Sequence, residues 1–525
     1  MDTFARDHLP PAALWPTIEF TTPELNYPAR LNAATELIDV PTAKFGPDRP
    51  ALRTPAGEVW SYGELLTRAN QVAQVLVEDL GLVPGQRVLL RSPNNPWTVA
   101  AWLGVLKAGG VLVTTMAALR TRELAPIVER TRPSIALVDD RFAEDVQGLP
   151  VVTYRDLAVR AQAKSGEFTA VDTAADDVAL LAPTSGSTGT PKITMHFHRD
   201  ILSIDNTFGR HVLRLNENDL VACTAPFAFT FGLGMLVVFP LRAGACALLT
   251  EAATPLQVAD LVAEHGVTVL ATAPTAYKAI LRDGAESKLA GLRTAVSAGE
   301  HIPRETWQRL RDRLGLEVID GIGATELLHI FISAAGDDIR PGSTGKPVPG
   351  YRATVLGVDG TELGPGEPGR LGVIGPVGCR YLDDARQKDY VVGGWNVTGD
   401  IFHRDEDGYF HYHARSDHMI VSSGYNIGGP EVEEAIDTHP DVLESAVVAK
   451  PDEERGSVVC AFVVLREGVE GDATKVKEIQ DHVKQTIAPY KYPRDVRFRT
   501  SLPRNASGKL QRFALRKIVE DEVLT

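Results

Sequence analysis

Nine residues, 184–192 (Thr-Ser-Gly-Ser-Thr-Gly-Thr-Pro-Lys), carry five hydroxyl groups, two glycines and one lysine. They directly follow the apolar run 178–182, which predicts a buried strand. Hydroxyl and ammonium groups donate hydrogen bonds to phosphate oxygens, and glycines let backbone N–H groups approach a ligand closely. The segment therefore fits a polyphosphate-binding loop, although clusters of Ser, Thr and Gly also form ordinary surface loops.

This loop differs from a Walker A motif, in which Gly-Lys-Ser/Thr leads directly into a helix. Here Pro191 separates the loop from Lys192, and residues 193–197 (Ile-Thr-Met-His-Phe) continue as a predicted strand. We therefore expect a strand–loop–strand hairpin.

Length and composition limit the possible classes of function. A chain of 525 residues is too long for one hydrophobic core and predicts at least two domains. The hydrophobic content of 44% and the charged content of 23% are typical of a globular enzyme. The formal net charge of −14 argues against a general binder of nucleic acid or anionic membrane, because phosphates would be repelled outside a local basic pocket.

Three features of the sequence indicate where in the cell the protein is expected. The four cysteines are widely spaced without a CxxC pair, so we expect neither a disulfide framework nor a zinc site. Residues 1–8 have no apolar core, so we expect no signal peptide. The uncharged run 221–241 contains prolines and glycines that would break a spanning helix, and we expect buried loop and strand there. A cytoplasmic protein is expected.

Strands and helices alternate through the first two thirds of the chain. Residues 51–54 and 58–61 predict a hairpin, and Ser61 with Glu64 predicts a capping box at the start of the next helix. Further predicted strands lie at 88–91, 110–115, 134–138 and 267–270, and further predicted helices lie at 97–106, 121–130 and 259–265. This alternation predicts an α/β fold with parallel-type sheets.

The pattern changes from about Gly342. Short β-prone segments at 351–356, 369–374 and 408–413 predict a small, largely antiparallel β module. Beyond it, helices at 430–438 and 475–487 and strands at 445–448 and 458–464 predict a compact α+β domain. We place the domain joint at Ser416–Asp417, which gives an N-terminal domain of residues 1–415 (with the β module at about 342–415) and a C-terminal domain of residues 416–525.

Several motifs together carry a family resemblance. The 184–192 loop resembles the signature loop of the acyl-adenylate-forming superfamily, which includes acyl-CoA and aryl-CoA ligases, peptide-synthetase adenylation domains and beetle luciferases. Further segments resemble that family's motifs in the family's order: 297–300 (Ser-Ala-Gly-Glu), 320–326 (Asp-Gly-Ile-Gly-Ala-Thr-Glu), 395–400 (Trp-Asn-Val-Thr-Gly-Asp), 415–417 (Arg-Ser-Asp) and 503–509 (Pro-Arg-Asn-Ala-Ser-Gly-Lys). Ile322 departs from the family's tyrosine, and Glu326 stands where a dinucleotide fingerprint would need a third glycine. By this series the chain is identified as a member of the superfamily.

The resemblance implies a reaction that uses ATP and Mg²⁺ and forms an acyl-adenylate. It assigns catalysis to Lys509, Thr325 and Glu326, with Thr325 donating to the α-phosphate and Glu326 as a hard carboxylate that helps to hold the metal. The implied nucleotide-binding residues are Thr184, Ser185, Gly186, Ser187, Thr188, Gly189, Lys192, Ala298, Gly299, Glu300, Asp320, Gly321, Ile322, Gly323, Asp400 and Arg415.

A second step, transfer of the acyl group to coenzyme A, implies a mobile C-terminal domain. Attack on the α-phosphate concentrates negative charge, so Lys509 must be delivered for that step and then withdrawn. Rotation about the implied hinge Asp417 would do this. It would also bring the implied CoA-binding residues Ser423, Gly424 and Tyr425 to the site, where Gly424 leaves room for the pantetheine arm.

Two segments resemble the benzoate-CoA ligase group, namely 326–331 (Glu-Leu-Leu-His-Ile-Phe) and 229–234 (Phe-Thr-Phe-Gly-Leu-Gly). Aromatic rings beside glycines make a flat slot, although such rings are also ordinary core, which we expect for Phe227. The implied substrate-binding residues are Phe229, Thr230, Phe231, Gly232, Gly323, Leu328, His329 and Ile330.

The choice of acid follows from further segments and two departures. Residues 195–200 and 423–431 most resemble 2-aminobenzoate (anthranilate)-CoA ligases, so we expect anthranilate first and benzoate or hydroxybenzoate next. Thr230 replaces the group's alanine and adds a hydroxyl able to bond an ortho amino or hydroxyl group. Val421 replaces a lysine and weakens the case for carboxylate anchoring there.

Clustered histidines raise the question of a metal site. His403, His411, His413 and His418 crowd together in the sequence, and His196 and His198 alternate. No cysteine or third ligand has suitable spacing, so a metal is not favoured. His329 has the better functional case.

Two other functions stay open at this point. One is a free-standing adenylation protein that loads a carrier-protein thiol instead of coenzyme A. The other is a degenerate adenylate-binding protein, against which the retained Thr325, Glu326, Asp400, Arg415 and Lys509 weigh. Oligomeric state is also open, with a homodimer as the assembly considered.

Overall fold

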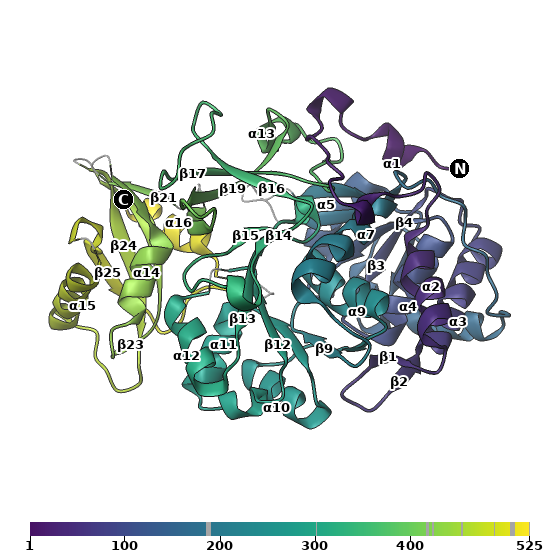
Figure 1. Cartoon of the computed structure of the whole chain (residues 1–525), viewed down its shortest axis with the longest axis horizontal. Coiled ribbons are helices and arrows are strands. Elements are labelled where there is room, and N and C mark those ends of the chain that lie inside the picture. Colours follow the sequence, from purple (N-terminus) through teal and green to yellow (C-terminus); the bar gives the residue numbers. More distant parts are fainter. Residues whose placement is uncertain are drawn as a thin grey trace. The chain divides into compact units, whose positions relative to one another are not determined.

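The computed structural model describes residues 1–184, 191–300, 302–415, 419–422, 425–452, 455–487, 489–504 and 510–523 (Figure 1). The chain divides into two compact units. Unit 1 comprises Met1–Ala353 and Gly372–Val397, and unit 2 comprises Thr354–Leu371 and Thr398–Thr525. This division passes through the predicted β module, and the joint proposed at Ser416–Asp417 remains a prediction.

Unit 1 contains a six-stranded sheet that carries the hydroxyl-rich hairpin. Its strand order is β6-β5-β3-β4-β7-β8, parallel except for the antiparallel pair β7–β8. The strands are β3 (Arg87–Arg91), β4 (Val111–Thr115), β5 (Ile135–Val138), β6 (Val151–Thr153), β7 (Val178–Thr184) and β8 (Lys192–Phe197). Strands β3 to β5 are buried along their whole length, as in parallel sheets covered on both faces. Helices α4 (Pro96–Lys107) and α5 (Thr121–Thr131) form where helices were predicted at 97–106 and 121–130.

A nine-stranded sheet forms the other half of unit 1. Its order is β15-β14-β13-β12-β11-β9-β10-β1-β2. The strands are β1 (Pro50–Arg53), β2 (Val59–Ser61), β9 (Leu220–Cys223), β10 (Cys246–Leu248), β11 (Val269–Thr272), β12 (Thr294–Ala298), β13 (Val318–Gly323), β14 (Ile330–Ser333) and β15 (Lys346–Pro347). Helices α10 (Pro255–His265), α11 (Pro274–Arg282) and α12 (Arg304–Leu314) lie along this sheet (Figure 1) and close one core with its buried aliphatic side chains. The parallel α/β architecture predicted from the alternation is confirmed.

Helix α3 (Tyr62–Gln74) begins as predicted. The Ser61 hydroxyl accepts a hydrogen bond from the backbone N–H of Glu64, and the backbone N–H of Ser61 donates to the Glu64 carboxylate at 2.8 Å. This capping box satisfies N–H groups that a helix start leaves without partners.

The prediction of loop and strand for residues 221–241 is wrong in part. The run is buried, but after β9 it is mostly helical, in α8 (Thr230–Leu233), η7 (Gly234–Val238) and α9 (Phe239–Ala243). Pro240 is the second residue of α9, just after the junction with the π-helix η7. Gly234 serves close packing, because a Cβ there would lie 2.5 Å from the ring of His329. No described helix is long and apolar enough to cross a membrane.

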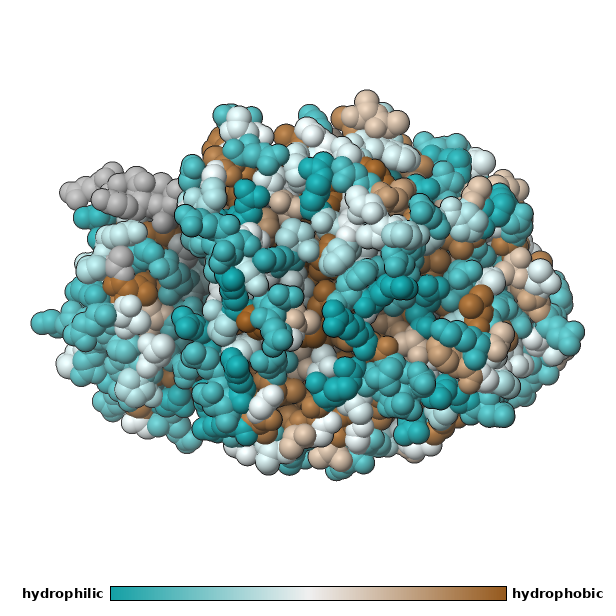
Figure 2. Space-filling view, viewed as in Figure 1, coloured by the Kyte–Doolittle hydropathy of each residue, from teal (hydrophilic) through white to brown (hydrophobic). Residues whose placement is uncertain are grey.

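Unit 2 contains the α+β elements predicted for the C-terminal part. Its three-stranded sheet has the order β23-β24-β25, and the hairpin β21–β22 contacts this sheet. A five-stranded sheet has the order β16-β17-β19-β18, with β20 paired to β19; of these strands β20 lies in unit 2, β18 lies in unit 1, and the other three cross the division of the chain. The bounds are β16 (Arg352–Leu356), β17 (Gly369–Ile374), β18 (Val391–Val392), β19 (Trp395–Arg404), β20 (Phe410–Arg415), β21 (Met419–Ser422), β22 (Tyr425–Gly428), β23 (Val442–Asp452), β24 (Gly456–Leu465), β25 (Asp495–Phe498), α14 (Gly429–Asp437), α15 (Ala473–Thr486) and α16 (Arg512–Val523). The face seen in Figure 2 is mainly hydrophilic, with scattered hydrophobic residues.

Candidate nucleotide and substrate site

The hydroxyl-rich segment joins two antiparallel strands, as predicted. Thr184, at the end of β7, pairs in register with Lys192, at the start of β8. The Arg130 guanidinium donates to the carbonyls of Pro191 and, at 2.6 Å, of Leu382, which anchors the return strand. The intervening residues Ser185, Gly186, Ser187, Thr188, Gly189 and Thr190 lie outside the described residues.

Lys192 meets Glu326, which the sequence separates by 134 positions. The Lys192 ammonium lies 3.2 Å from Glu326 Oε1, and the Glu326 side chain is only 8% exposed. Glu326 is placed by the short helix η9 (Thr325–Leu327), which follows β13. The structure thus brings together the lysine expected to meet phosphate and the carboxylate expected to meet metal.

Tyr381 completes this arrangement and was not identified from the sequence. Its hydroxyl donates to Glu326 Oε1 and accepts from the Lys192 ammonium at 2.8 Å. Burial and the neighbouring Glu326 carboxylate raise the pKa of Tyr381 far above its usual value near 10, so the hydroxyl stays protonated. No local sequence pattern marks Tyr381, because it meets its partners only through the fold.

Glu326 also fits the role of a metal ligand. Its Oε1 atom accepts from two donors, Lys192 and Tyr381, whereas no described residue donates to its second oxygen, Oε2. A carboxylate oxygen of this kind suits a hard divalent cation such as Mg²⁺.

The Ser-Ala-Gly-Glu and Asp-Gly-Ile-Gly segments lie side by side at the carboxyl ends of two parallel strands. Ala298 pairs with Gly321 across β12 and β13, and Gly299 and Glu300 follow directly. Gly299 has φ +91°, a left-handed conformation that favours glycine. Ile322 and Gly323 are partly open to solvent. Ligands of open α/β sheets bind at this end of the strands, so the predicted adenine-binding residues are well placed.

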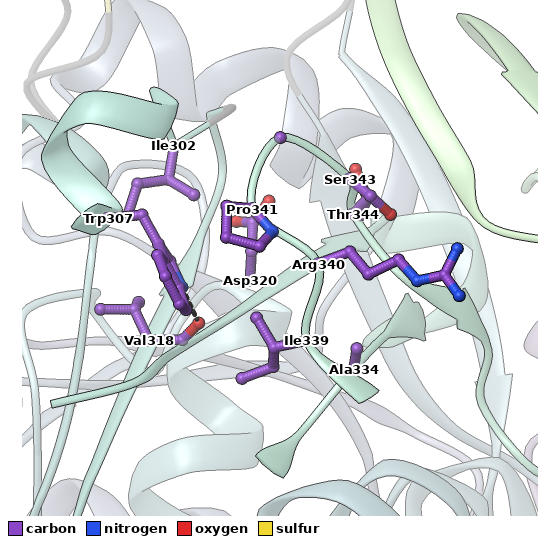
Figure 3. Close-up of a pocket in the computed structure, with 11 residues that line it drawn as sticks. Ile302, Trp307, Val318, Asp320, Ala334, Ile339, Arg340, Pro341, Ser343 and Thr344 are labelled. Atoms are coloured by element: carbon purple, nitrogen blue, oxygen red, sulfur yellow. Dashed lines mark hydrogen bonds between the residues drawn. The ribbon is translucent and has the colours of Figure 1, made fainter. Parts of the chain in front are cut away.

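Asp320, on β13, is a partly buried acid whose Oδ1 atom is fully buried. This oxygen has no hydrogen-bond partner among the described residues, and desolvation raises the pKa of the carboxyl to about 8. It lines a small pocket with Trp307, whose indole N–H donates to the Val318 carbonyl at 2.9 Å, and with the 340–344 turn (Figure 3). Such an oxygen is suited to accept from a ligand amine.

His329 is the centre of an aromatic cluster. Its ring stacks on Phe231, with centroids 5.6 Å apart, and packs against Phe208 and Phe239 at 5.3 and 4.7 Å. The side chain is buried, neither ring nitrogen has a hydrogen-bond partner in the part of the chain that the structure describes, and burial lowers the pKa of His329 to about 3. Phe208 and Phe239 were not identified from the sequence. Phe239 lies in the uncharged run 221–241 and resembles ordinary core, and Phe208 is a single aromatic residue in the largely polar segment η6 (Asp205–Leu213).

The other predicted slot residues surround this cluster or support it. Phe229 and Thr230 are partly exposed at the start of α8, whereas Phe227 is only 3% exposed and belongs to the core, as expected. Gly232 lies against Pro226, Gly323 lies against the His329 backbone, and Ile330 packs on Gly321.

Leu328 connects Glu326 to His329 through a strained turn. It has φ +67° and ψ −31°, and the N–H of His329 donates to the Leu327 carbonyl at 2.9 Å. An i to i+2 hydrogen bond around a residue of positive φ is a γ-turn, which a residue with a side chain adopts only at a cost.

Unit 2 holds the remaining predicted site residues. Asp400 and Arg415 face each other across β19 and β20, with Nη1 to Oδ1 at 3.1 Å, and Tyr425 begins β22. Asp417, Ser423, Gly424 and Lys509 lie outside the described residues, as does the side chain of Val421, so their roles stay predictions.

Clustered histidines do not form a three-ligand metal site among the described residues of β19 and β20. His403 Nδ1 lies 2.8 Å from His413 Nε2, while His411 Nε2 bonds Asp405 at 3.0 Å. The described group with metal-compatible spacing is His439, Asp441 and Glu478, and Lys475 already pairs with both of its carboxylates. His418 lies outside the described residues.

Comparison with known proteins gives consistent matches over nearly the whole chain. The family model for AMP-binding enzymes matches residues 41–380, and the model for the AMP-binding enzyme C-terminal domain matches residues 431–509. The chain is 34% identical to benzoate-CoA ligase of Thauera aromatica, over 94% of this chain and 98% of that protein. It is 33% identical to mitochondrial acyl-coenzyme A synthetase ACSM3 of Pongo abelii, over 94% of this chain and 90% of that protein.

A solved structure agrees in fold. The anthranilate CoA ligase AuaEII in complex with anthranoyl-AMP superposes with a TM-score of 0.90 at 30% identity, covering 96% of this chain and 100% of that chain. The chain therefore belongs to the AMP-binding enzyme family, that is, to the acyl-adenylate-forming superfamily.

Proposed function

We propose that the chain is an ATP- and Mg²⁺-dependent, AMP-forming aryl-CoA ligase. The observation that carries this proposal is the contact of Lys192 and Tyr381 with Glu326, which places a phosphate-binding cation beside a metal-binding carboxylate. Family membership and the names of the relatives, benzoate-CoA ligase and anthranilate CoA ligase among them, support the same activity.

The reaction has two steps. A carboxylate oxygen of the acid attacks the α-phosphorus of ATP, the bond to the β-phosphate oxygen breaks, and pyrophosphate leaves. The thiol sulfur of coenzyme A then attacks the acyl carbon of the adenylate, AMP leaves with the bonding electron pair, and the thiol proton passes to solvent. Splitting the transfer in this way replaces one difficult step with two easier ones.

Residues of unit 1 serve the first step. Lys192 and the Thr184 end of the hairpin bind the phosphates, and Thr325 donates to the α-phosphate as negative charge develops there. Asp320 Oδ1, which is unpartnered and buried, accepts from the exocyclic amine of adenine. Bound Mg²⁺ neutralises phosphate charge, and Glu326 Oε2 would help to hold it.

The C-terminal part serves both steps by moving. Asp400 accepts the ribose hydroxyls and Arg415 lies next to it. Lys509 supplies a cation for adenylation and is then withdrawn by rotation about Asp417. Ser423, Gly424 and Tyr425 line the CoA path in the second arrangement.

The acid is aromatic, with anthranilate preferred and benzoate or hydroxybenzoate next. The stacked rings of Phe231 and His329 favour a flat substrate over an alkyl chain. Thr230, at the start of α8, offers a hydroxyl for an ortho substituent.

Four buried free cysteines suit a reducing cytoplasm. A homodimer is the proposed assembly, and light scattering would test it.

The decisive experiment measures both steps with a panel of acids. ATP–pyrophosphate exchange reports adenylation and CoA-thioester formation reports the second step, with anthranilate, benzoate, 3- and 4-hydroxybenzoate, and medium-chain fatty acids as substrates. We expect anthranilate to have the highest kcat/KM. Higher kcat/KM for medium-chain acids would overturn the aromatic assignment, and transfer to a carrier protein but not to CoA would overturn the ligase assignment.

A variant of matched size tests the contact of Lys192 and Tyr381 with Glu326, on which the proposal depends. Glu326→Gln keeps the size of the side chain but removes its charge, so adenylation should fall and need more Mg²⁺. Unchanged adenylation and unchanged Mg²⁺ dependence would remove Glu326 from the site.

A further inference from the structure

Strand β8 presents three polar side chains on one face toward the segment that holds Glu326. Lys192, Thr194 and His196 alternate along the strand and so point the same way. Lys192 contacts the Glu326 carboxylate, and His196 Nε2 lies 2.9 Å from the backbone carbonyl oxygen of Thr325. β8 belongs to the six-stranded sheet, whereas Thr325 and Glu326 follow β13 of the nine-stranded sheet.

We infer that His196 is a positioning residue for adenylation. Its ring holds the Thr325–Glu326 turn at a fixed place against the phosphate-binding hairpin, and so sets the register between the two halves of the nucleotide site. The inference rests on the proposed roles of Thr325 and Glu326.

The hydrogen-bond pattern fixes which nitrogen of His196 carries the proton. The Thr194 hydroxyl donates to the Ala182 carbonyl at 3.1 Å, so its oxygen is left to accept from His196 Nε2 at 3.0 Å. The Thr325 carbonyl can only accept. Nε2 is therefore the protonated nitrogen, and it donates to both oxygens.

The other side of the ring faces a buried ion pair. His196 Nδ1 lies 4.0 Å from Asp200 Oδ2, which accepts from Arg380 Nη1 at 2.9 Å, and all three side chains are fully buried. Burial lowers the pKa of His196 to about 4, so the ring is neutral at physiological pH and acts as a fixed donor. Because His196, Asp200 and Arg380 are all fully buried, the ring has little free space in which to turn away.

The Thr325–Glu326 turn would relax without the hydrogen bond from His196. The Thr325 carbonyl accepts a second hydrogen bond, from the N–H of Leu328 at 3.1 Å, and Leu328 has φ +67°. Strained backbone persists only where the surroundings fix it. Loss of the His196 donor would let Thr325 and Glu326 shift, and a displacement of about 1 Å in a positioned group costs about 10²-fold in rate.

The test compares two substitutions at His196. In His196→Gln the amide nitrogen can reach the place of Nε2, whereas in His196→Asn it reaches only the place of Nδ1. We expect His196→Asn to lower kcat/KM for ATP–pyrophosphate exchange by about 10- to 100-fold and to raise the Mg²⁺ concentration needed for half activity. His196→Gln should recover most of this loss, and thioester formation from supplied aryl-adenylate should stay near the wild-type rate.

His198 provides the matched control. It is as buried as His196 and has a pKa lowered to about 4 by the same cause, but its Nδ1 accepts from the Ala33 N–H at 3.1 Å, away from Glu326. His198→Asn should lower thermal stability without a selective effect on adenylation. The inference is overturned if His196→Asn and His198→Asn lose adenylation in proportion to their stability, or if His196→Gln gives no recovery.

A separate result addresses the proposed function. If Glu326→Gln has normal Mg²⁺-dependent adenylation while His196→Asn is impaired, the role of Glu326 fails and the register argument fails with it. If Glu326→Gln is impaired and His196→Asn is normal, only the inference about His196 fails.

Discussion

Removal of the Tyr381 hydroxyl is the most direct test of how Glu326 is held. Tyr381→Phe keeps the ring but deletes the donor to Glu326 Oε1 and the acceptor for Lys192. A hydrogen bond to a charged group contributes about 1.5–3 kcal/mol. The lower part of that range applies, because Lys192 and Glu326 remain 3.2 Å apart and keep their direct contact. A loss of about 1.5–2 kcal/mol in transition-state stabilisation corresponds to about a 10- to 30-fold fall in kcat/KM for adenylation.

The assay is ATP–pyrophosphate exchange with the best aromatic acid, run beside thioester formation from supplied aryl-adenylate. Only the exchange reaction should slow, because the proposed roles of Glu326 and Lys192 concern the phosphates of ATP. Tyr390→Phe is the control, because the Tyr390 ring packs edge-on against Tyr381 at 5.9 Å but contributes none of the hydrogen bonds described for Glu326. Exchange within about twofold of wild type, or equal losses in Tyr381→Phe and Tyr390→Phe, would refute this account of the site.

Three further expectations can be measured independently. Thr230→Val should reduce kcat/KM for anthranilate relative to benzoate by about 5- to 10-fold, the effect of one lost neutral hydrogen bond, and an unchanged ratio would exclude contact with the ortho group. The pKa of His198 is about 4 in the folded protein against 6.5 ordinarily, so the unfolded chain takes up a proton first as pH falls and stability is lost between about pH 6.5 and 4. Urea unfolding should therefore show a smaller loss of stability from pH 7.5 to 5 in His198→Gln than in wild type, by about 2 kcal/mol, and parallel curves would contradict the buried neutral state. Lys509→Ala should slow adenylation by about 10²- to 10³-fold while sparing thioester formation from supplied adenylate, and equal losses in both steps would contradict its assignment.

Much of the α/β framework was predictable because it depends on local patterns. The strands β3, β4 and β5 are short apolar runs between turn residues, and the Ser61–Glu64 capping box is readable within four positions. The hairpin of β7 and β8 was predictable for the same reason, since a short apolar run precedes the hydroxyl-rich segment and a second short β-prone run, residues 193–197, follows it.

The run 221–241 was predicted less well, because glycines and prolines within an apolar run are typical of breaks in regular structure. In the fold, Gly234 lets a helix approach His329, and Pro240 starts the next helix. A sequence does not distinguish a glycine that interrupts a helix from one that allows a close contact.

The side chains that hold the site were the hardest to predict. Tyr381 meets Glu326 across 55 positions, and His196 meets Thr325 across 129. Neither residue has a neighbour in the sequence that marks its role. His196 lies in the 195–200 segment that carries the resemblance to anthranilate-CoA ligases and was considered as half of a metal pair, but neither observation predicts its contact with Thr325. The contacts of Tyr381 and His196 form only when folding brings the six-stranded and nine-stranded sheets together in unit 1.

Leu328 has a consequence for any redesign of this protein. Glu326, the proposed metal ligand, and His329, whose ring we propose lines the aromatic slot, are separated by only two positions, and the strained γ-turn at Leu328 lies between them. A substitution that reshapes the slot at 328 or 329 will therefore also move Glu326. Variants selected for a new acid should lose turnover with every acid, including the original one, unless the change is confined to Thr230 at the start of α8.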